Sequence, residues 1–264
     1  VYTASVIAAV ELTGADDGFP TAAIAMPHGI VVLATKRHTD RCFTRYLVTD
    51  SLEAIRPQWN RRPFMASAMA ALPDGAHYVS GRRDGTLDVH AVCTRATDYD
   101  DPVAVMTDRH AEAVNAVLSF GAHSLATASD DGTVCVWDTR THSRSFSQDA
   151  RSNAYSVVQV SSDHLATSHY DGVIRVWDLR ARTCVLELEG HVGAVGPLVL
   201  LPTSHLVSLG HDDHTLRLWE VQGGGRCAAV MRLPAQPRCA LLLRSGNLLM
   251  VGCDDGVVYG ITLG

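Results

Sequence analysis

A short phrase recurs along this chain: an apolar segment, a turn built on aspartate, and a second apolar segment that often ends in an aromatic residue. The copies read YVSGRRDGTLDVH from Tyr78, LATASDDGTVCVWD from Leu125, LATSHYDGVIRVWD from Leu165, LVSLGHDDHTLRLWE from Leu206 and LMVGCDDGVVYGI from Leu249. The turn aspartates are separated by 47, 40, 42 and 42 residues, at Asp84, Asp131, Asp171, Asp213 and Asp255. Such a period indicates a series of similar units that pack against one another.

Each phrase has the chemistry of a β-hairpin. Aliphatic and β-branched residues flank an Asp-Gly pair in all copies but that from Leu206, and both residues of such a pair tolerate the positive φ of a tight turn. Further apolar stretches precede the phrase at residues 113–119, 154–160, 194–201 and 238–243, and others follow it at 183–188 and 226–233. The repeat unit is therefore predicted to be a sheet of four strands.

A weaker copy at residues 30–48, with an inner strand at 21–26, makes six repeats. The last phrase ends at residues 261–264 without an outer strand, whereas a β-like segment at residues 2–12 has no repeat of its own. We expect this segment to complete the sixth sheet and close the ring, because closure removes open sheet edges. The expected fold is an all-β, closed β-propeller of six four-stranded blades in one domain, 1–264, or of seven blades if part of the chain is absent.

The composition excludes several classes of protein. Hydrophobic residues make up 47% and charged residues 19%, which is typical of a globular protein. A net charge of −6 provides no general attraction for a phosphate backbone, so we expect no nucleic-acid partner. We find no apolar stretch long enough to span a bilayer and no signal-peptide pattern, and we expect neither membrane binding nor secretion. The chain begins at Val1 instead of Met, which indicates processing or a longer parent protein.

The seven cysteines are widely scattered, at Cys42, Cys93, Cys135, Cys184, Cys227, Cys239 and Cys253. Their odd number and the absence of a CxxC pair argue against a disulfide framework or a zinc knuckle. Most lie in apolar runs, as buried reduced thiols do. We therefore expect a cytoplasmic protein, with the nucleus as the alternative.

These repeats resemble the WD-repeat family over essentially the whole chain. Trp137-Asp138 and Trp177-Asp178 are the closing dipeptide of that family, and Trp219 is followed by Glu in a mild variant. In that family a His before the inner strand, a Ser or Thr on the second strand, the turn Asp and the Trp form a buried hydrogen-bonded set. The natural role of such a set is stability, because it satisfies buried donors and acceptors.

The resemblance implies such sets in the three central repeats. The matching residues are His110, Thr127, Asp131 and Trp137 in the third repeat, Thr167, Asp171 and Trp177 in the fourth, and His191, Ser208, Asp213 and Trp219 in the fifth. The fourth repeat has Ala150 at the histidine position. The fifth has one extra residue, so either Asp212 takes the structural role or a bulge absorbs it. The second repeat ends in His90 and the sixth has Val251 at the hydroxyl position, so we expect the outer repeats to depend more on packing.

Residues with catalytic or metal-binding chemistry have simpler structural explanations. His110, Thr127 and Asp131 are the residue types of a nucleophile triad, but their spacing recurs in series and no nucleophile-elbow motif accompanies them. Phosphate-loop, dinucleotide-binding and zinc-protease patterns are absent as well. The run HDDH at 211–214 holds the densest group of metal-ligand side chains, yet neighbours on a tight turn rarely converge on one ion. We expect no enzymatic activity, no cofactor and no metal.

The turns that carry the aspartates should lie on one face of the blades, which we call the turn-aspartate face. The residue before each turn aspartate should point to solvent there, joined by two residues at the starts of inner strands. These candidates are Arg83, Asp130, Tyr170, Asp212 and Asp254, with Asn153 and Arg238. Exposed Arg and Tyr on a rigid scaffold favour binding of proteins or peptides; ordinary solvated surface is the alternative.

The stretch RPQWNRRPF at 56–64 interrupts the repeat rhythm. Its two prolines argue against a regular strand, so we expect an irregular loop. Trp59, Arg61 and Arg62 would there anchor an acidic or aromatic partner segment. The alternative is that Trp59 covers the first blade.

On the opposite face, residues 137–140 and 177–180 both read WDxR. This is similar to the motif by which some WD-repeat proteins dock onto a cullin ubiquitin-ligase adaptor, which would make Arg140 and Arg180 contact residues. The predicted function is a non-catalytic scaffold or adaptor that binds other proteins or peptides. We expect a monomer that joins a larger complex. A substrate-receptor or ubiquitin-handling module of a cullin-type ligase is the alternative function.

Overall fold

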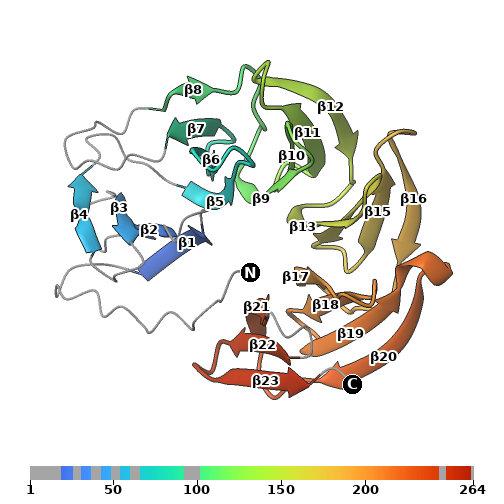
Figure 1. The fold of residues 1–264 in the computed structure, drawn as a ribbon. Helices are drawn as coiled ribbons and strands as arrows, with labels where there is room; N and C mark the ends of the chain where they lie inside the picture. The colour runs from blue at the N-terminus through green and yellow to red at the C-terminus, as the bar shows by residue number, and fades with distance from the viewer. Residues whose placement is uncertain are drawn as a thin grey trace. The chain divides into compact units, whose positions relative to one another are not determined.

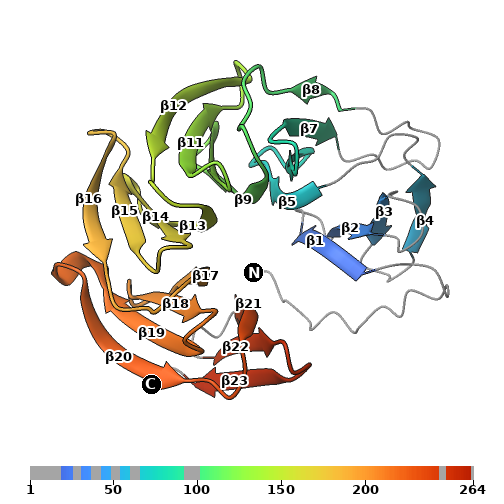
Figure 2. The same ribbon diagram turned by 180° about the vertical axis from the view of Figure 1, so that it is seen from behind.

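The computed structural model describes residues 19–25, 31–36, 43–48, 54–59, 66–91, 102–243 and 248–262 (Figures 1 and 2). These residues form β-strands and a short 3-10 helix, η2 (Val221–Gly223). The chain divides into two compact units, residues 1–125 with 138–144 and residues 126–137 with 145–264. The predicted all-β class is confirmed for the described residues.

The first sheet has the order β1-β2-β3-β4 and antiparallel pairing throughout. Its strands are β1 (Phe19–Ala25), β2 (Val31–Lys36), β3 (Phe43–Val48) and β4 (Ala54–Trp59). Strand β4 corrects the prediction of an irregular loop, because residues 56–59 are part of it. Pro57 lies on the outermost strand of this sheet, where the register shifts between Arg45↔Gln58 and Leu47↔Ile55. An edge strand tolerates a missing N–H at such an irregularity. Arg61 and Arg62 lie outside the described residues.

The remaining strands form five further sheets whose orders follow the chain. The second consists of β5 (Ala66–Ala71), β6 (His77–Arg82), β7 (Leu87–Ala91) and β8 (Ala104–Val105), and the third of β9 (Val114–Phe120), β10 (Ser124–Ser129), β11 (Thr133–Asp138) and β12 (Ser143–Asp149). The fourth consists of β13 (Ala154–Ser161), β14 (His164–His169), β15 (Ile174–Asp178) and β16 (Thr183–Leu188), and the fifth of β17 (Val195–Leu200), β18 (Leu206–Gly210), β19 (Thr215–Glu220) and β20 (Arg226–Arg232). The sixth has three described strands, β21 (Pro237–Leu242), β22 (Leu248–Cys253) and β23 (Val258–Thr262).

Strand positions within the repeats agree with the sequence pattern. The inner strands β9, β13, β17 and β21 coincide with the predicted segments to within a few residues at either end, and β16 matches 183–188. The count of six blades and closure of the ring by residues 2–12 remain predictions, since residues 1–18 lie outside the described part of the chain.

All five turn aspartates have the same local geometry. Each carboxylate accepts the backbone N–H two residues further on, over 2.9–3.1 Å, with the pairs Asp84–Thr86, Asp131–Thr133, Asp171–Val173, Asp213–Thr215 and Asp255–Val257. The intervening residue has positive φ in every copy: a glycine in four of them and His214, at φ 53°, in the fifth repeat. The Asp-Gly pair therefore encodes the turn locally.

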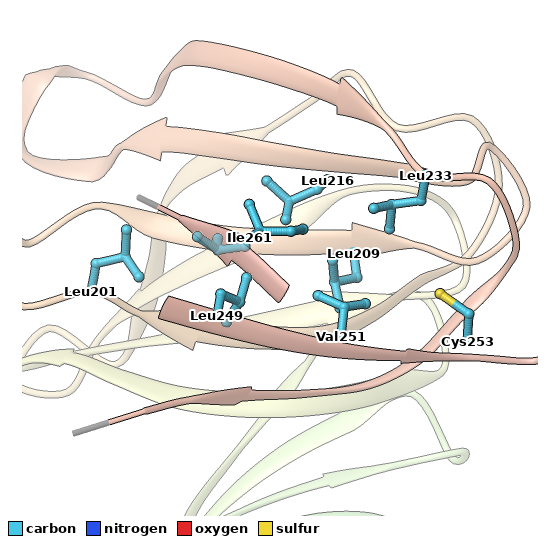
Figure 3. Close-up of a cluster of buried hydrophobic side chains, with 9 residues drawn as sticks. Leu201, Leu209, Leu216, Leu233, Leu249, Val251, Cys253 and Ile261 are labelled. Atoms are coloured by element: carbon cyan, nitrogen blue, oxygen red, sulfur yellow. The ribbon is translucent and has the colours of Figure 1, made fainter. Parts of the chain in front are cut away.

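A hydrophobic cluster fills the space between the fifth and sixth sheets (Figure 3). Leu209 and Leu216 from β18 and β19 pack there with Leu249 and Val251 of β22 and Ile261 of β23. Fully burying one such side chain contributes about 1.5–3 kcal/mol. Val251, at the position where a hydroxyl was expected, has no exposed surface in this cluster. The sixth repeat thus uses packing at this position, as predicted.

Candidate functional site

The fifth sheet contains a chain of hydrogen bonds that runs from a tryptophan to an aspartate. Trp219 Nε1 donates to Ser208 Oγ at 2.8 Å, and His191 Nε2 lies 2.6 Å from the same oxygen. His191 Nδ1 lies 2.9 Å from Asp213 Oδ2. An ionised carboxylate can only accept, so Nδ1 donates to Asp213 and Nε2 accepts the hydroxyl hydrogen of Ser208. The structure thus brings together the four residues that the resemblance implied.

Burial sets the charge of this set and its accessibility. Burial lowers the pKa of His191, so the ring is neutral. Burial raises the pKa of Asp213. The hydrogen bonds that this carboxylate accepts from the Val192 N–H, His191 and Thr215 outweigh burial, and the net effect is a lowered pKa. Ser208 and the side chain of His191 have no exposed surface. The Ser208 hydroxyl is therefore enclosed, and the hydrogen bonds of this set satisfy buried donors and acceptors.

The extra residue of the fifth turn is absorbed at Asp212. Its Oδ2 accepts the Ala194 N–H at 2.8 Å. The N–H of His211 donates to the Ala194 carbonyl at 2.8 Å, and in the fourth repeat the N–H of Tyr170 donates to the Asn153 carbonyl at 3.0 Å. By this backbone criterion the counterpart of Tyr170 is His211. Asp212 is an additional carboxylate at the turn.

The fourth sheet builds its polar set with a different histidine. Trp177 Nε1 donates to Thr167 Oγ1 at 2.7 Å, and the same oxygen lies 2.7 Å from His169 Nε2. His169 Nδ1 lies 3.2 Å from the Ser152 carbonyl oxygen, which can only accept. The ring therefore carries a proton at Nδ1. Burial, assisted by the charge of Arg175, lowers its pKa to about 4.

Sequence reasoning missed His169 because it searched for the imidazole before the inner strand, where Ala150 lies. The available signal was a histidine two residues after the hydroxyl residue, in a repeat without the leading histidine. In their own sheets His191 and His169 both reach the hydroxyl, the first from 17 residues before it in sequence and the second from two residues after it.

The turn aspartates of the fourth and sixth repeats are held by the residue four positions later. Arg175 Nη2 donates to Asp171 Oδ2 at 2.7 Å, and Tyr259 Oη donates to Asp255 Oδ2 at 2.8 Å. Arg175 Nε also donates to Glu187 Oε1 at 3.2 Å, which ties β15 to β16. A long side chain on the third strand therefore replaces the histidine that holds Asp213 in the fifth repeat.

In the third sheet, Trp137 Nε1 donates to Thr127 Oγ1 at 2.8 Å. His110 is almost fully buried, and its backbone N–H donates to the Gly85 carbonyl at 2.9 Å. Asp131 Oδ1 accepts the hydroxyl hydrogen of Thr133 at 2.7 Å.

The second sheet, whose repeat was expected to depend more on packing, keeps one polar contact of the set. His90 Nε2 lies 3.1 Å from Ser80 Oγ, and the His90 ring stacks on Tyr78 with centroids 4.9 Å apart. Histidine thus takes the position of the tryptophan and keeps a polar contact to the second strand.

The candidates for the turn-aspartate face differ in exposure. Those that are exposed are Arg83, Tyr170, Asp212, Arg238 and Asp254, and those that are partly buried are Asp130 and Asn153. Tyr170 is 62% exposed, an unusual exposure for a large aromatic side chain. Arg238 Nη2 lies 4.0 Å from Asp254 Oδ2.

A residue that sequence reasoning did not select, Tyr155, lies beside Tyr170. The two ring centroids are 6.5 Å apart and the ring planes meet at 78°. Burial and the charges of Asp130, Tyr170 and Asp212 raise the pKa of Tyr155. Groups from three successive repeats therefore influence the pKa of Tyr155. The signal in the sequence was an aromatic residue at the start of an inner strand.

The two arginines of the WDxR pattern are exposed and paired with carboxylates. Arg140 Nη2 and Nε donate to Asp138 at 2.8 and 3.2 Å, and these hydrogen bonds lower the pKa of Asp138. Arg180 Nε donates to Asp163 Oδ1 at 2.9 Å. Their side chains are 65% and 81% exposed. A partner protein that binds these arginines would have to compete with Asp138 and Asp163, which already accept their hydrogen bonds.

Within the described ranges, no three His, Cys, Asp or Glu side chains gather as metal ligands would. Among the described cysteines, two are buried, two are partly buried and one is exposed: Cys135 and Cys253, Cys184 and Cys227, and Cys239. The prediction of mostly buried thiols is therefore wrong for these five. Cys42 and Cys93 lie outside the described residues. No helix in the described segments is long and apolar enough to cross a membrane.

Comparison with known sequences supports the repeat assignment. The family described as WD domain, G-beta repeat matches residues 101–138, 145–178 and 182–220, which cover the third to fifth repeats. WD repeat-containing protein 55 of Arabidopsis thaliana is 26% identical over 194 residues, which are 72% of this chain and 54% of that protein. The ribosome biogenesis protein BOP1 homolog of Oryza sativa subsp. japonica is 46% identical over 49 residues, 19% of this chain and 7% of that protein. The chain therefore spans about half the length of the first relative and a small part of the second.

Solved structures show the same fold. The WD40 β-propeller domain of Doa1 matches with a TM-score of 0.73 and 20% identity, covering 92% of this chain and 78% of that domain. The computationally designed Ika8 protein matches with a TM-score of 0.71 and 20% identity, covering 92% of this chain and 71% of the designed one. At this identity the likeness shows the fold alone, an all-β propeller. With its recurring Asp-Gly hairpins, its Trp-to-hydroxyl hydrogen bonds and three successive matched repeats, the chain has the fold of a β-propeller and is similar over residues 101–220 to the WD domain, G-beta repeat family.

Proposed function

We propose that this protein is a non-catalytic scaffold that binds other proteins or peptides through its turn-aspartate face. WD40 propellers generally act as protein-interaction scaffolds and are typically non-catalytic. The observation that carries the proposal is the exposure of Tyr170 on a turn that is otherwise held by hydrogen bonds. Tyrosine and arginine, here represented by Tyr170 and Arg83, are enriched among the residues that dominate binding energy.

The turn beneath Tyr170 is ordered before any partner arrives. Asp171 accepts the Val173 N–H at 3.1 Å and binds Arg175, and the Tyr170 N–H is bonded to the Asn153 carbonyl. A loop that is already ordered loses little conformational entropy on binding, which favours affinity. This arrangement supports a binding role for the face.

Affinity purification with mass spectrometry tests the proposal. We expect partner recovery to be lost with Tyr170→Ala or Arg83→Glu, while the melting temperature stays unchanged. Ser162→Ala, at an exposed turn elsewhere in the fourth repeat, is the control and should recover the partner normally. Normal recovery with both face variants would show that another surface binds.

We also propose that the protein has six blades, with the ring closed by residues 2–12. It would be a monomer that joins a larger complex, in the cytoplasm or the nucleus.

Val258 on β23, the last described strand of the three-stranded sheet, is 59% exposed. A fourth strand at that edge would cover it. Deletion of residues 2–12 is expected to lower the melting temperature, and an unchanged value would reject closure by this segment.

The alternative function, a substrate-receptor or ubiquitin-handling module of a cullin-type ligase, is favoured by the exposure of Arg140 and Arg180. Its test is recovery of a cullin adaptor with the unmodified protein and its loss on Arg140→Ala with Arg180→Ala. An unmodified protein that recovers no adaptor rejects this alternative.

A further inference from the structure

We propose that Tyr155 and Tyr170, together with Asp130 and Asp212, form a recognition site for an arginine side chain of a partner protein or peptide. We call these four residues the tyrosine site. The inference rests on the proposed function, since the site lies on the turn-aspartate face, and it specifies the chemistry of the partner. All four residues belong to the second compact unit.

The tyrosine pair presents aromatic surface to solvent. Tyr155 is the second residue of β13 and is partly buried, whereas Tyr170 is 62% exposed at the tip of the turn after β14. Their rings meet edge to face, 6.5 Å between centroids and 78° between planes. In this arrangement the two rings offer faces in different directions. The electron-rich face of a tyrosine attracts a cation that lies within about 6 Å of its centre.

Two carboxylates from the flanking repeats lie around this pair. Asp212 is oriented by the Ala194 N–H at 2.8 Å, and Asp130 Oδ1 lies 3.5 Å from Asn153 Nδ2. The inner strands β13 and β17 are adjacent, because the Leu198 N–H donates to Ser156 Oγ at 3.3 Å. The contact between Asn153 and Asp130 thus places the third turn, and the contact between β13 and β17 the fifth, beside the fourth repeat.

Two carboxylates contribute negative charge near the tyrosine pair. Burial is the largest cause of the raised pKa of Tyr155, and the charges of Asp130, Tyr170 and Asp212 raise it further. The nearby imidazole adds no positive charge, because burial and the charge of Arg238 lower the pKa of His211. A cation entering the site would gain Coulombic stabilisation from both aspartates.

The combination of aromatic faces and carboxylates favours arginine among the cationic side chains. A guanidinium is planar, stacks on an aromatic face and still donates hydrogen bonds in its own plane to a carboxylate. An ammonium is a compact, strongly hydrated point charge that gains less from such a site.

The fourth repeat contributes both tyrosines and the third contributes Asp130. The fifth repeat contributes Asp212 but no aromatic residue. There the position that corresponds to Tyr155 is Gly196, and the His211 ring occupies the space where a side chain at that position would begin. The aromatic surface therefore ends at Gly196.

A peptide titration tests the inference directly. The probe is acetyl-Gly-Gly-Arg-Gly-Gly-amide, with citrulline and lysine analogues, followed through the tyrosine ring signals of the labelled protein by NMR. We expect saturable shifts at Tyr155 and Tyr170, with affinity for the citrulline peptide about tenfold lower because citrulline keeps the shape of arginine without its charge. The lysine peptide should bind more weakly than the arginine peptide.

Variants separate the two components of the site. Asp130→Asn with Asp212→Asn, and separately Tyr170→Leu, should each weaken the arginine peptide about tenfold with the melting temperature unchanged. Asp163→Asn, which removes a partly buried carboxylate in the same blade, should leave binding unchanged.

Equal binding of the arginine and citrulline peptides, or no saturable shift with the unmodified protein, overturns the inference. The proposed function has a separate criterion. A partner that is lost with Tyr170→Ala but retained with Asp130→Asn and Asp212→Asn would leave the scaffold proposal standing and reject recognition by the two carboxylates. Arginine-peptide binding with partner recovery unaffected by any face variant would support the site and reject the scaffold proposal.

Discussion

His169 Nε2 lies 2.7 Å from the Thr167 hydroxyl, so the fourth sheet takes from its own second strand the imidazole that the fifth sheet takes from His191. In both sheets the hydroxyl also accepts the indole N–H of a tryptophan, Trp177 or Trp219. In each of these polar sets the hydroxyl contacts one tryptophan and one histidine, but the histidine can come from different positions in the sequence.

Removal of this imidazole should destabilise the protein. We expect His169→Ala to lower the free energy of unfolding by about 2 kcal/mol, because the hydroxyl hydrogen of Thr167 loses its acceptor and the Ser152 carbonyl loses the imidazole N–H. Denaturant unfolding monitored by tryptophan fluorescence measures this loss. His164→Ala is the control, since His164 lies at the start of the same strand with its side chain 37% exposed, and it should cost well under 1 kcal/mol. Equal losses for the two variants would contradict the assignment.

The neutrality of His169 should make stability depend on pH. Its folded pKa of about 4 lies below the ordinary value of 6.5, so between these values the unfolded chain binds a proton that the folded chain does not. The stability that His169 contributes is complete above pH 6.5 and falls by roughly 3 kcal/mol as the pH decreases towards 4. His169→Gln, which keeps a polar partner for Thr167 without a titrating ring, should flatten this part of the stability profile. Identical profiles for the two proteins would show that His169 does not titrate in this way.

Ser208→Ala tests the fifth sheet. The change removes the oxygen that accepts the Trp219 N–H and that donates to His191, so two buried ring nitrogens lose their partner. We expect a loss of about 2–4 kcal/mol in unfolding free energy, against less than about 0.5 kcal/mol for the exposed Ser162→Ala. A loss near that of the control would mean that the hydroxyl is dispensable.

His110→Ala is the corresponding test in the third repeat. Because His110 is almost fully buried, we expect a lower melting temperature and a loss of about 2–3 kcal/mol. An unchanged melting temperature, measured by differential scanning calorimetry, would remove His110 from the structural set.

Gly172→Ala tests the requirement for glycine after the turn aspartate. Gly172 has φ +86°, and a Cβ there would lie 2.9 Å from the His191 carbonyl oxygen and 3.0 Å from that of Gly193. Gly121→Ala is a matched control, because Gly121 has φ +59° and no neighbouring atom within 4 Å. The control should show only the cost of the left-handed conformation, about 1 kcal/mol, and Gly172→Ala a clearly larger loss. Equal losses in chemical denaturation would show that the close approach is relieved without penalty.

The hairpins could be predicted from the sequence because their determinants are local. An aspartate that caps the N–H two residues later, followed by a residue of positive φ, specifies the turn within four residues. The strand at Pro57 could not be predicted in this way. A proline is tolerated there because β4 is the outermost strand and its register shifts beside Pro57, and both facts concern pairing with β3.

By itself the sequence determined the repeat, the position of each turn and the strands on either side, since period and turn chemistry are properties of neighbouring residues. Only the tertiary structure decided that His169 completes the fourth polar set and that Tyr155 lies among Asp130, Tyr170 and Asp212. A buried hydroxyl can be satisfied by any donor or acceptor that reaches it, and a surface site is made by whichever turns come together. Both depend on distances between segments that are remote in the chain.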